Sequence, residues 1–335
     1  MKWLVTGGCG FIGTSLIRHL ITEGNHSITV LDNLTTGTRE DLSNVCDFDE
    51  IPREALLSAY RSGDSCNLAL DRRCKLIAGD ILDQELAHAV SRDADIIVHL
   101  AANTGVGRSV EDPRLDCHTN VIGTFNYLEA ARQNKVSRFV FASSGAPIGE
   151  VEPPIHEELA PHPASPYGAS KLAGEGYCSA YKHSFGLDTV ILRFGNVYGP
   201  GSLHKGSVVA KFIRRAMNSQ PLEIFGDGTQ TRDFIYIEDL IEAVLKAATK
   251  QGIGGEIFQI ATNRETTVGE MTEYLVRIMQ SRGIQGIKLR NAERPPGDVR
   301  RNFSDTSKAR RLLNWQSKTH LEAGLERTVD YFLQP

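Results

Sequence analysis

A glycine-rich segment near the start of the sequence constrains the fold more than any other feature. Three glycines with G-x-x-G-x-x-G spacing follow an apolar run at residues 3–6 and open an amphipathic stretch at residues 11–23. Glycine in such a turn permits positive φ angles and a close approach of the backbone to a ligand, and the N-terminus of the next helix attracts anions. The segment therefore predicts a pyrophosphate cradle made of Gly7, Gly10, Phe11, Ile12 and Gly13.

Asp32 ends the next predicted strand and favours a particular dinucleotide. It lies about twenty residues beyond the last of these glycines, where a carboxylate accepts hydrogen bonds from the hydroxyls of an adenosine ribose. The same carboxylate repels a 2′-phosphate, and Asn33 and Leu34 supply no compensating cation. We therefore expect NAD rather than NADP, with Arg39 as the one nearby cation that argues against this choice.

The first half of the chain alternates short β-branched runs with longer amphipathic stretches. Strands are predicted at residues 3–6, 27–31, 75–78, 95–99, 138–143 and 188–193, and helices at 11–23, 120–133 and 166–185. This alternation predicts an α/β fold with a doubly wound parallel sheet, the Rossmann fold, which binds its ligand beyond the carboxyl ends of the strands. Residues 39–73 interrupt the rhythm, and we interpret them as an inserted loop or a short helical excursion.

A second, smaller α/β lobe is predicted after the sheet. The pattern loosens into Gly- and Pro-rich turns, with helices near residues 207–218, 237–249 and 268–281. With 335 residues, one or two domains are expected. We assign residues 1–195 to the cofactor domain and 196–335 to a substrate lobe that is partly interleaved with it.

Composition excludes several classes of protein. The formal net charge of −4, from 37 basic and 41 acidic residues, gives no broad positive field for nucleic acid. No apolar run approaches the ~20 residues of a membrane span and no leader pattern precedes the first strand, so we expect a cytoplasmic protein with no membrane contact. The six cysteines lack metal-ligand spacing, which predicts free thiols and no metal site. Cys46, Cys66 and Cys74 share one loop-like stretch and are the minor exception.

Tyr167 and Lys171 form the first part of a catalytic constellation. They stand four residues apart at the start of a predicted helix, so both side chains lie on one face. A phenol with a pKa near ~10 becomes a useful base when an adjacent ammonium and a nicotinamide cation stabilise the phenolate. Ser143 and Ser144 follow the fifth strand, where a hydroxyl can share a proton with Tyr167, although either serine could simply be a turn residue.

Seven segments spread along the chain form a recognisable set. They are TGGCGFIG at 6–13, HLAA at 99–102, NVIGT at 120–124, the serines at 143–144, YGASK at 167–171, RFGNVYGP at 193–200 and GTQTRDF at 228–234. Together they resemble the extended short-chain dehydrogenases/reductases, in the branch of nucleotide-sugar epimerases and dehydratases. The resemblance runs in order from residue 2 to about 330.

The resemblance implies a set of site residues and a mechanism. Ser144 and Tyr167 would handle the proton of the sugar C4 hydroxyl while Lys171 orients the nicotinamide ribose, so that C4 is oxidised to a 4-keto sugar and reduced again on its other face. Cofactor contacts would come from Asn33, Thr36, Gly37, Asp80, Ile81, Leu100, Ala101, Ala102, Asn120 and Ser143. Substrate contacts would come from Asn196, Val209, Phe225, Arg232 and Arg300.

Departures from the family pattern bear on the reaction and the substrate. After Ser144 the chain reads Gly-Ala-Pro-Ile-Gly, without the Asp-Glu pair of related dehydratases or the Glu of decarboxylases, so 4-epimerisation is favoured. Pro295 replaces a family arginine, whose role Arg294 or Arg300 could take. Asn302 replaces a bulky aromatic of some galactose epimerases, which hints at room for an N-acetyl group.

The expected substrate is a UDP-hexose, either UDP-glucose/galactose or UDP-glucuronate, with His204 or Lys205 near a sugar carboxylate. A decarboxylase, a 4,6-dehydratase and a catalytically silent NAD-binding sensor or scaffold remain the alternatives. By resemblance we also expect a homodimer.

Overall fold

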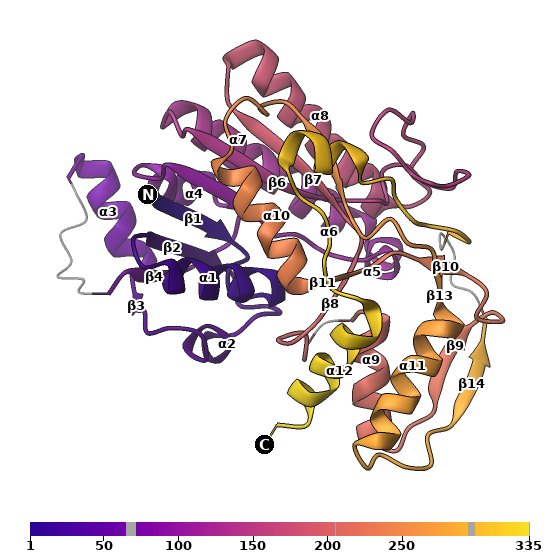
Figure 1. Ribbon diagram of the computed structural model, residues 1–335. Coiled ribbons are helices and arrows are strands. Elements are labelled where there is room, and N and C mark those ends of the chain that lie inside the picture. The colour runs from indigo at the N-terminus through magenta and orange to yellow at the C-terminus, as the bar shows by residue number, and fades with distance from the viewer. Residues whose placement is uncertain (65–71, 205, 294–298, 335) are drawn as a thin grey trace.

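A parallel sheet of eight strands lies at the centre of the computed structural model, which describes residues 1–64, 72–204, 206–293 and 299–334 (Figure 1). The chain starts in the middle of the sheet at β1, extends it through β2 and β4, and then crosses to β5, β6 and β7 on the other side. The strand order is β12-β7-β6-β5-β1-β2-β4-β3, which confirms the predicted doubly wound fold. The strands are β1 Lys2–Thr6, β2 Ser27–Asp32, β3 Asp49–Glu50, β4 Cys74–Ala78, β5 Ile96–His99, β6 Arg138–Ser144, β7 Thr189–Phe194 and β12 Ile257–Ile260.

Helices cover both faces of this sheet, because successive side chains of each buried strand point to opposite sides. Val140 of β6 packs in the same cluster as residues of α1 (Phe11–Glu23) and α10 (Ile237–Thr249). Phe139 and Phe141 pack in a second cluster with residues of the helices on the other face. Those helices are α4 Gln84–Ser91, α7 Gly123–Gln133 and α8 Pro166–Phe185.

The segment at 39–73 contains more regular structure than the sequence predicted. Two helices, α2 (Arg39–Ser43) and α3 (Arg53–Ser62), flank the short strand β3. Because β3 pairs in parallel with β4, the segment extends the central sheet by one strand. Residues 65–71, with Cys66, lie outside the described residues.

The helix predicted at 120–133 begins later than expected. Three short elements precede it, namely α5 Val106–Glu111, α6 Pro113–Cys117 and the π-helix η1 His118–Ile122. In η1 the N–H of Gly123 bonds the carbonyl of His118, five residues back, which is the wide π-helical turn. Regular α-helix resumes at Gly123 as α7.

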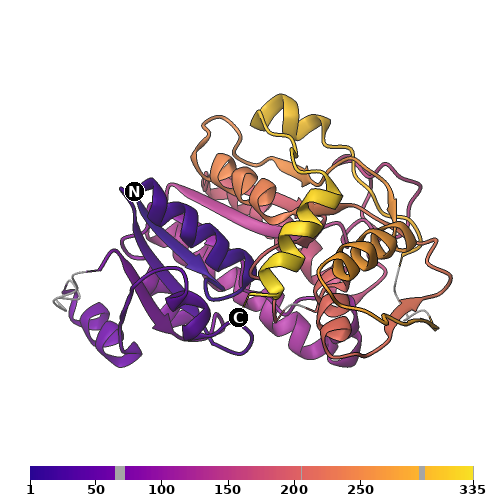
Figure 2. The ribbon, with the colours of Figure 1, turned by 60° about the horizontal axis from the view of Figure 1, so that its bottom comes forward.

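The second lobe packs beside the carboxyl ends of the central strands (Figures 1 and 2). The helices predicted in this half are confirmed as α9 (Val208–Met217), α10 and α11 (Val268–Ser281). The short strands of the lobe were not predicted. Its other elements are β8 Asn196–Tyr198, β9 Leu222–Phe225, β10 Thr231–Arg232, β11 Phe234–Tyr236, β13 Thr266–Thr267, β14 Leu289–Ala292, η2 Ala309–Leu313 and α12 Leu321–Phe332.

One part of the second half of the chain belongs to the central sheet. Helix α10 packs against α1 and β6, and β12 pairs in parallel with β7 to form the sheet edge. Within the described residues, no helix is long and apolar enough to cross a membrane.

Candidate active site

The glycine cradle connects the end of β1 to the start of α1. Gly7 has a φ of +69°, and a Cβ there would lie 2.8 Å from the backbone nitrogen of Ala101. A Cβ on Gly13 would lie 2.4 Å from the carbonyl oxygen of Gly7, so larger residues do not fit at either position. Helix α1 begins after Gly10, and no side chain caps its first turn. The dipole of this uncapped N-terminus suits a phosphate group, as the sequence predicted.

Asp32 lies at the carboxyl end of β2, next to the cradle. Its carboxylate is 7% exposed and accepts hydrogen bonds from the backbone N–H groups of Cys9 and Leu34, both at 2.9 Å. Burial raises the pKa of this carboxyl above its usual value. Arg39 forms two hydrogen bonds with Glu50, at 2.7 and 2.9 Å, so the cation that argued for a 2′-phosphate is already paired. These contacts fit a dinucleotide with a free ribose 2′-hydroxyl.

The other predicted cofactor residues lie on loops at the same sheet edge. In the loop after β2, Gly37 packs against the backbone of Cys9, and Thr36 precedes it. The Asn33 amide donates to Asp80 after β4 at 3.0 Å. Ile81 follows Asp80 and packs against Gly123.

The loop after β5 is held by buried hydrogen bonds. The backbone N–H groups of Leu100 and Ala101 donate to the carbonyl oxygen and the hydroxyl of Thr6, at 3.1 and 3.3 Å, and Ala102 follows them. His99 lies between Thr6 and Thr124, and its burial lowers its pKa to about 3. His99 is therefore a neutral structural residue.

Asn120 lies in the π-helix η1, and its side-chain amide makes several hydrogen bonds. Its amide accepts from the N–H of Asn103 at 2.8 Å, and its nitrogen lies within 3.1 Å of the Asn103 carbonyl, Asp116 Oδ1 and Ser170 Oγ. The network links the loop after β5 to α8, which carries the candidate catalytic residues. Within the described residues, the other carboxylate oxygen of Asp116 is buried without a hydrogen-bond partner.

The structure brings Tyr167, Lys171 and Ser144 together where β6 ends and α8 begins. Ser165 caps α8 and Pro166 occupies its first turn, which places Tyr167 at the start of the helix. Lys171, one turn later, donates from Nζ to the carbonyl of Ala142 at 2.9 Å and lies 6.0 Å from the centre of the Tyr167 ring. The Ser144 hydroxyl accepts from the backbone N–H of Ala146 at 3.2 Å and lies close enough to the Tyr167 phenol to lower its pKa.

Burial dominates the electrostatics of this trio. It raises the pKa of Tyr167 to about 12, against the smaller lowering by the Ser144 hydrogen bond. It lowers the pKa of Lys171 to about 8, while the negative charges of Asp116 and Glu175 act in the opposite direction. The sequence-based expectation of a depressed Tyr167 pKa is not met by the protein groups alone, because desolvation of the phenolate is the largest effect and raises the pKa.

Ser143 makes a buried side-chain hydrogen bond that the sequence did not predict. Its hydroxyl donates to Glu175 at 2.5 Å, and its contact with a cofactor stays a prediction. Glu175 in turn pairs with Arg193 of β7. Sequence reasoning missed Glu175, Arg193 and Asp116. For Glu175 a signal was available, since it follows Lys171 by four residues on the same helix face.

A match to a protein-family model shows which family this chain belongs to. The model described as the NAD dependent epimerase/dehydratase family matches residues 3–261. The chain belongs to this epimerase/dehydratase family.

Its relatives extend over the whole chain. A UDP-glucose 4-epimerase from Mycolicibacterium smegmatis is 34% identical, covering 99% of this chain and 98% of that protein. A UDP-glucose 4-epimerase structure from Thermotoga maritima with UDP-glucose is 34% identical, with a TM-score of 0.85 over 99% of this chain and 98% of the other. A UDP-glucuronic acid 4-epimerase from Bacillus cereus, solved with UDP-glucuronic acid and NAD, is 31% identical, with a TM-score of 0.84 and the same coverage. NAD is the cofactor of the family, as Asp32 predicted.

In this family member, the residues expected to bind substrate are spread over the second lobe. Asn196 lies exposed at the start of β8, and Arg232 lies in β10. Phe225 ends β9, with the Lys211 ammonium 5.5 Å from its ring centre. Val209, by contrast, is 1% exposed within the core of α9.

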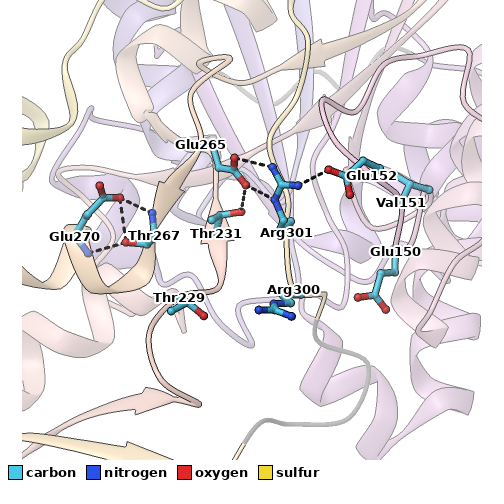
Figure 3. A pocket seen from close by; sticks show the side chains of 10 residues that line it. All are labelled: Glu150, Val151, Glu152, Thr229, Thr231, Glu265, Thr267, Glu270, Arg300 and Arg301. Carbon is cyan, nitrogen blue, oxygen red and sulfur yellow. Dashed lines mark hydrogen bonds and ion pairs between the residues drawn. The ribbon is translucent and has the colours of Figure 1, made fainter.

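Arg300 borders a cavity of about 710 Å³ (Figure 3). Ser144, Tyr167 and Lys171 do not line this cavity. At its centre Arg301 pairs with Glu265 and Glu152, and Thr231 donates to Glu265 at 2.8 Å. The cavity lining is Glu150, Val151, Glu152, Thr229, Thr231, Glu265, Thr267, Glu270, Arg300 and Arg301.

Several weaker expectations concern the sugar end of the site. Asn302 is a neighbour of the catalytic segment, because a Cβ on Gly145 would lie 3.5 Å from its amide nitrogen. His204 is exposed. Lys205, Arg294 and Pro295 lie outside the described residues. The described cysteines, at 9, 46, 74, 117 and 178, are free thiols, and the described residues contain no cluster placed to hold a metal ion.

Proposed function

We propose that the protein is an NAD-dependent 4-epimerase of a UDP-hexose, UDP-glucose/galactose or UDP-glucuronate, working through a 4-keto intermediate. The observation that carries this proposal is the grouping of Tyr167, Lys171 and Ser144 where β6 ends and α8 begins, at the sheet edge that also bears the glycine cradle. Relatives that act on UDP-glucose and on UDP-glucuronic acid support the choice of substrates.

The cradle and the loops at the sheet edge would hold the cofactor. Gly7, Gly10, Phe11, Ile12 and Gly13 would contact the pyrophosphate, and Asp32 would accept from the adenosine ribose. The remaining contacts would come from Asn33, Thr36, Gly37, Asp80, Ile81, Leu100, Ala101, Ala102 and Asn120, together with the backbone of Ser143. When bound, NAD supplies a reversible hydride acceptor for the sugar C4.

The trio would carry the proton. Tyr167 takes the proton from the C4 hydroxyl and later returns it, while Ser144 hydrogen-bonds the same oxygen. Lys171, anchored on Ala142, positions the nicotinamide ribose and supplies positive charge beside the phenol. Because burial keeps the Tyr167 pKa at about 12, the phenolate requires further positive charge in the loaded site.

The second lobe would bind the nucleotide end. Arg232 suits a diphosphate as a charge-assisted donor, and Asn196 and Arg300 would assist it. Phe225 would stack on the base, and Val209 would form part of the apolar surface beneath it. In this assignment residues 196–335 form the substrate lobe, apart from α10 and β12, which complete the sheet of the cofactor domain at 1–195.

Epimerisation is preferred to dehydration or decarboxylation because of the segment after Ser144. Gly145 and Ala146 stand where those reactions require carboxylates. The next acids, Glu150 and Glu152, line the cavity that Arg300 borders, and Glu152 is paired with Arg301. A silent sensor is disfavoured because it has no need of a proton-transfer trio.

Turnover of three substrates tests the proposal. We expect the purified protein to interconvert UDP-glucose or UDP-glucuronate with its C4 epimer, observed by proton NMR, without added NAD and with no keto-deoxy sugar or pentose product. UDP-N-acetylglucosamine tests whether Asn302 leaves room for an N-acetyl group. Absence of turnover with all three, and no near-ultraviolet absorbance of reduced nicotinamide on mixing, would remove the UDP-sugar assignment.

We also propose a homodimer formed through α8 and its neighbouring helices. Large apolar side chains are exposed on these elements, whose helices contact one another. They are Val110, Leu115, Ile122, Tyr177 and Phe185. Burying such a patch against a second copy would remove it from water.

The Tyr177→Glu variant tests this interface. We expect a dimer for the unmodified protein and a monomer for the variant in light scattering coupled to size-exclusion chromatography, because the charge cannot be buried unpaired. Leu289→Glu, at a residue that is 53% exposed on the other lobe, is the matched control and should remain dimeric. A monomeric unmodified protein contradicts the proposal.

A further inference from the structure

A fully buried ion pair lies directly behind the candidate catalytic trio. Glu175 of α8 and Arg193 of β7 are each 3% exposed, and the guanidinium donates to the carboxylate at 2.6 and 2.9 Å. Burying two charges costs several kcal/mol of desolvation, and well-packed apolar residues often serve stability equally well. A buried pair at this place therefore calls for a reason beyond stability.

Glu175 is connected to the end of the catalytic strand. It accepts the Ser143 hydroxyl at 2.5 Å, and Lys171, one turn earlier on α8, donates to the carbonyl of Ala142 at 2.9 Å. Helix α8 is thus fixed to two consecutive residues of β6. Ser144 is the next residue of that strand, so the two bonds hold the backbone from which its side chain extends.

Glu175 also contributes to the electrostatic surroundings of Lys171. The charged and titratable groups that act on Lys171 come from three elements, and they are Asp116 of α6, His99 of β5, and Tyr167, Glu175 and Cys178 of α8. Asp116 and Glu175 are the carboxylates of this set, and both oppose the desolvation that lowers the Lys171 pKa to about 8. His99 is neutral because its pKa is about 3.

We propose that Glu175 is a positioning residue of this active site: its carboxylate, held by Arg193, fixes Ser143 and with it Ser144, and places a negative charge behind the Lys171 ammonium. The inference rests on the proposed function for the meaning of Ser144 and Lys171. Its electrostatic part concerns the protein alone and is measurable without a substrate.

The Glu175→Gln variant separates charge from shape. Glutamine has nearly the same size, but it removes the negative charge, so the Lys171 ammonium is less stabilised and loses its proton at lower pH. We expect the Lys171 titration midpoint to fall by about one pH unit. The measurement is NMR of protein labelled at the lysine Cε carbon, with the Lys171 signal assigned by its loss in Lys171→Met.

Asp188→Asn is the matched control, because it breaks the ion pair between Asp188 and Arg138. This pair lies at the opposite end of β6 from Ser143. Asp188 accepts from Arg138, the first residue of β6, at 2.7 and 3.1 Å. This control should lose stability as Glu175→Gln does, yet leave the Lys171 midpoint unchanged. An unchanged midpoint in Glu175→Gln, or an equal shift in both variants, would overturn the proposal.

Ser143→Ala provides a second test, since it keeps the ion pair intact and is a mild change for folding. We expect kcat to fall about tenfold with KM and bound NAD unchanged, because the variant loosens Ser144 without altering a binding contact. Loss of bound NAD, with kcat fully restored when NAD is added, would return Ser143 to the cofactor site and refute its positioning role. If no UDP-sugar is turned over but the Lys171 midpoint still shifts, the proposed function fails while the electrostatic role of Glu175 stands.

Discussion

Tyr167→Phe is expected to reduce epimerisation by about 10³-fold while the fold and the NAD content are retained. The position is half-buried, and phenylalanine keeps the ring and removes only the hydroxyl. Without that hydroxyl, the proton of the sugar C4 hydroxyl has no acceptor at the start of α8. The measurement is kcat for the preferred UDP-sugar, together with the NAD released on denaturation.

Tyr181→Phe is the matched control for this experiment. Tyr181 lies on the same helix and is 5% exposed, and its hydroxyl donates to Glu129 at 2.6 Å, so the control also loses one buried hydrogen bond. We expect it to remain active within about threefold. Full activity of Tyr167→Phe would mean that another group accepts the proton, and the proposed mechanism would then be wrong.

Gly13→Ala is expected to remove NAD and, with it, all activity. The added Cβ would lie 2.4 Å from the Gly7 carbonyl oxygen and 2.5 Å from the Gly8 Cα, both of which are backbone atoms that cannot rotate away. The turn must open, which costs about 1–3 kcal/mol of stability and spreads the N–H groups that would bind the pyrophosphate. We expect copurified NAD to fall by at least about tenfold, since each 1.4 kcal/mol corresponds to that factor.

Gly107→Ala provides the comparison for the cradle variant. Gly107 lies in α5, where a Cβ would meet no atom within 4 Å, so alanine should preserve stability, NAD content and turnover. Thermal melting and NAD content of both variants complete the measurement. Normal NAD content in Gly13→Ala would show that the cradle tolerates the widening and that the pyrophosphate binds elsewhere.

The sequence predicted the centre of the fold well, for a physical reason. Strands such as β1 and β6 are buried on both faces and therefore appear in the sequence as continuous β-branched and aromatic runs. The ends of these two strands were predicted to within about one residue. Two-residue strands such as β3 carry no such signal. Strand β12 is buried as well, but it follows Gly-rich turns in a region whose pattern suggested a separate lobe.

The candidate site was predictable as a set of residues but not as an electrostatic environment. Spacing placed Tyr167 and Lys171 on one face, and topology placed Ser144 beside them. Spacing does not reveal burial, so the raised pKa of Tyr167 could not be foreseen. The partner of Ser143 was equally hidden, because Arg193 and Glu175 read as ordinary polar residues in the sequence and pair only when α8 packs on β7.

The contribution of α10 and β12 to the central sheet has a consequence for how the protein can be divided. A fragment ending at residue 195 would leave the backbone groups of β7 bare along one side and the apolar residues beneath α10 open to water. Such a fragment should aggregate when expressed alone. The cofactor domain of this chain is therefore not a module that could be exchanged between proteins. Its last strand is supplied by the half of the chain that would carry the specificity for the sugar.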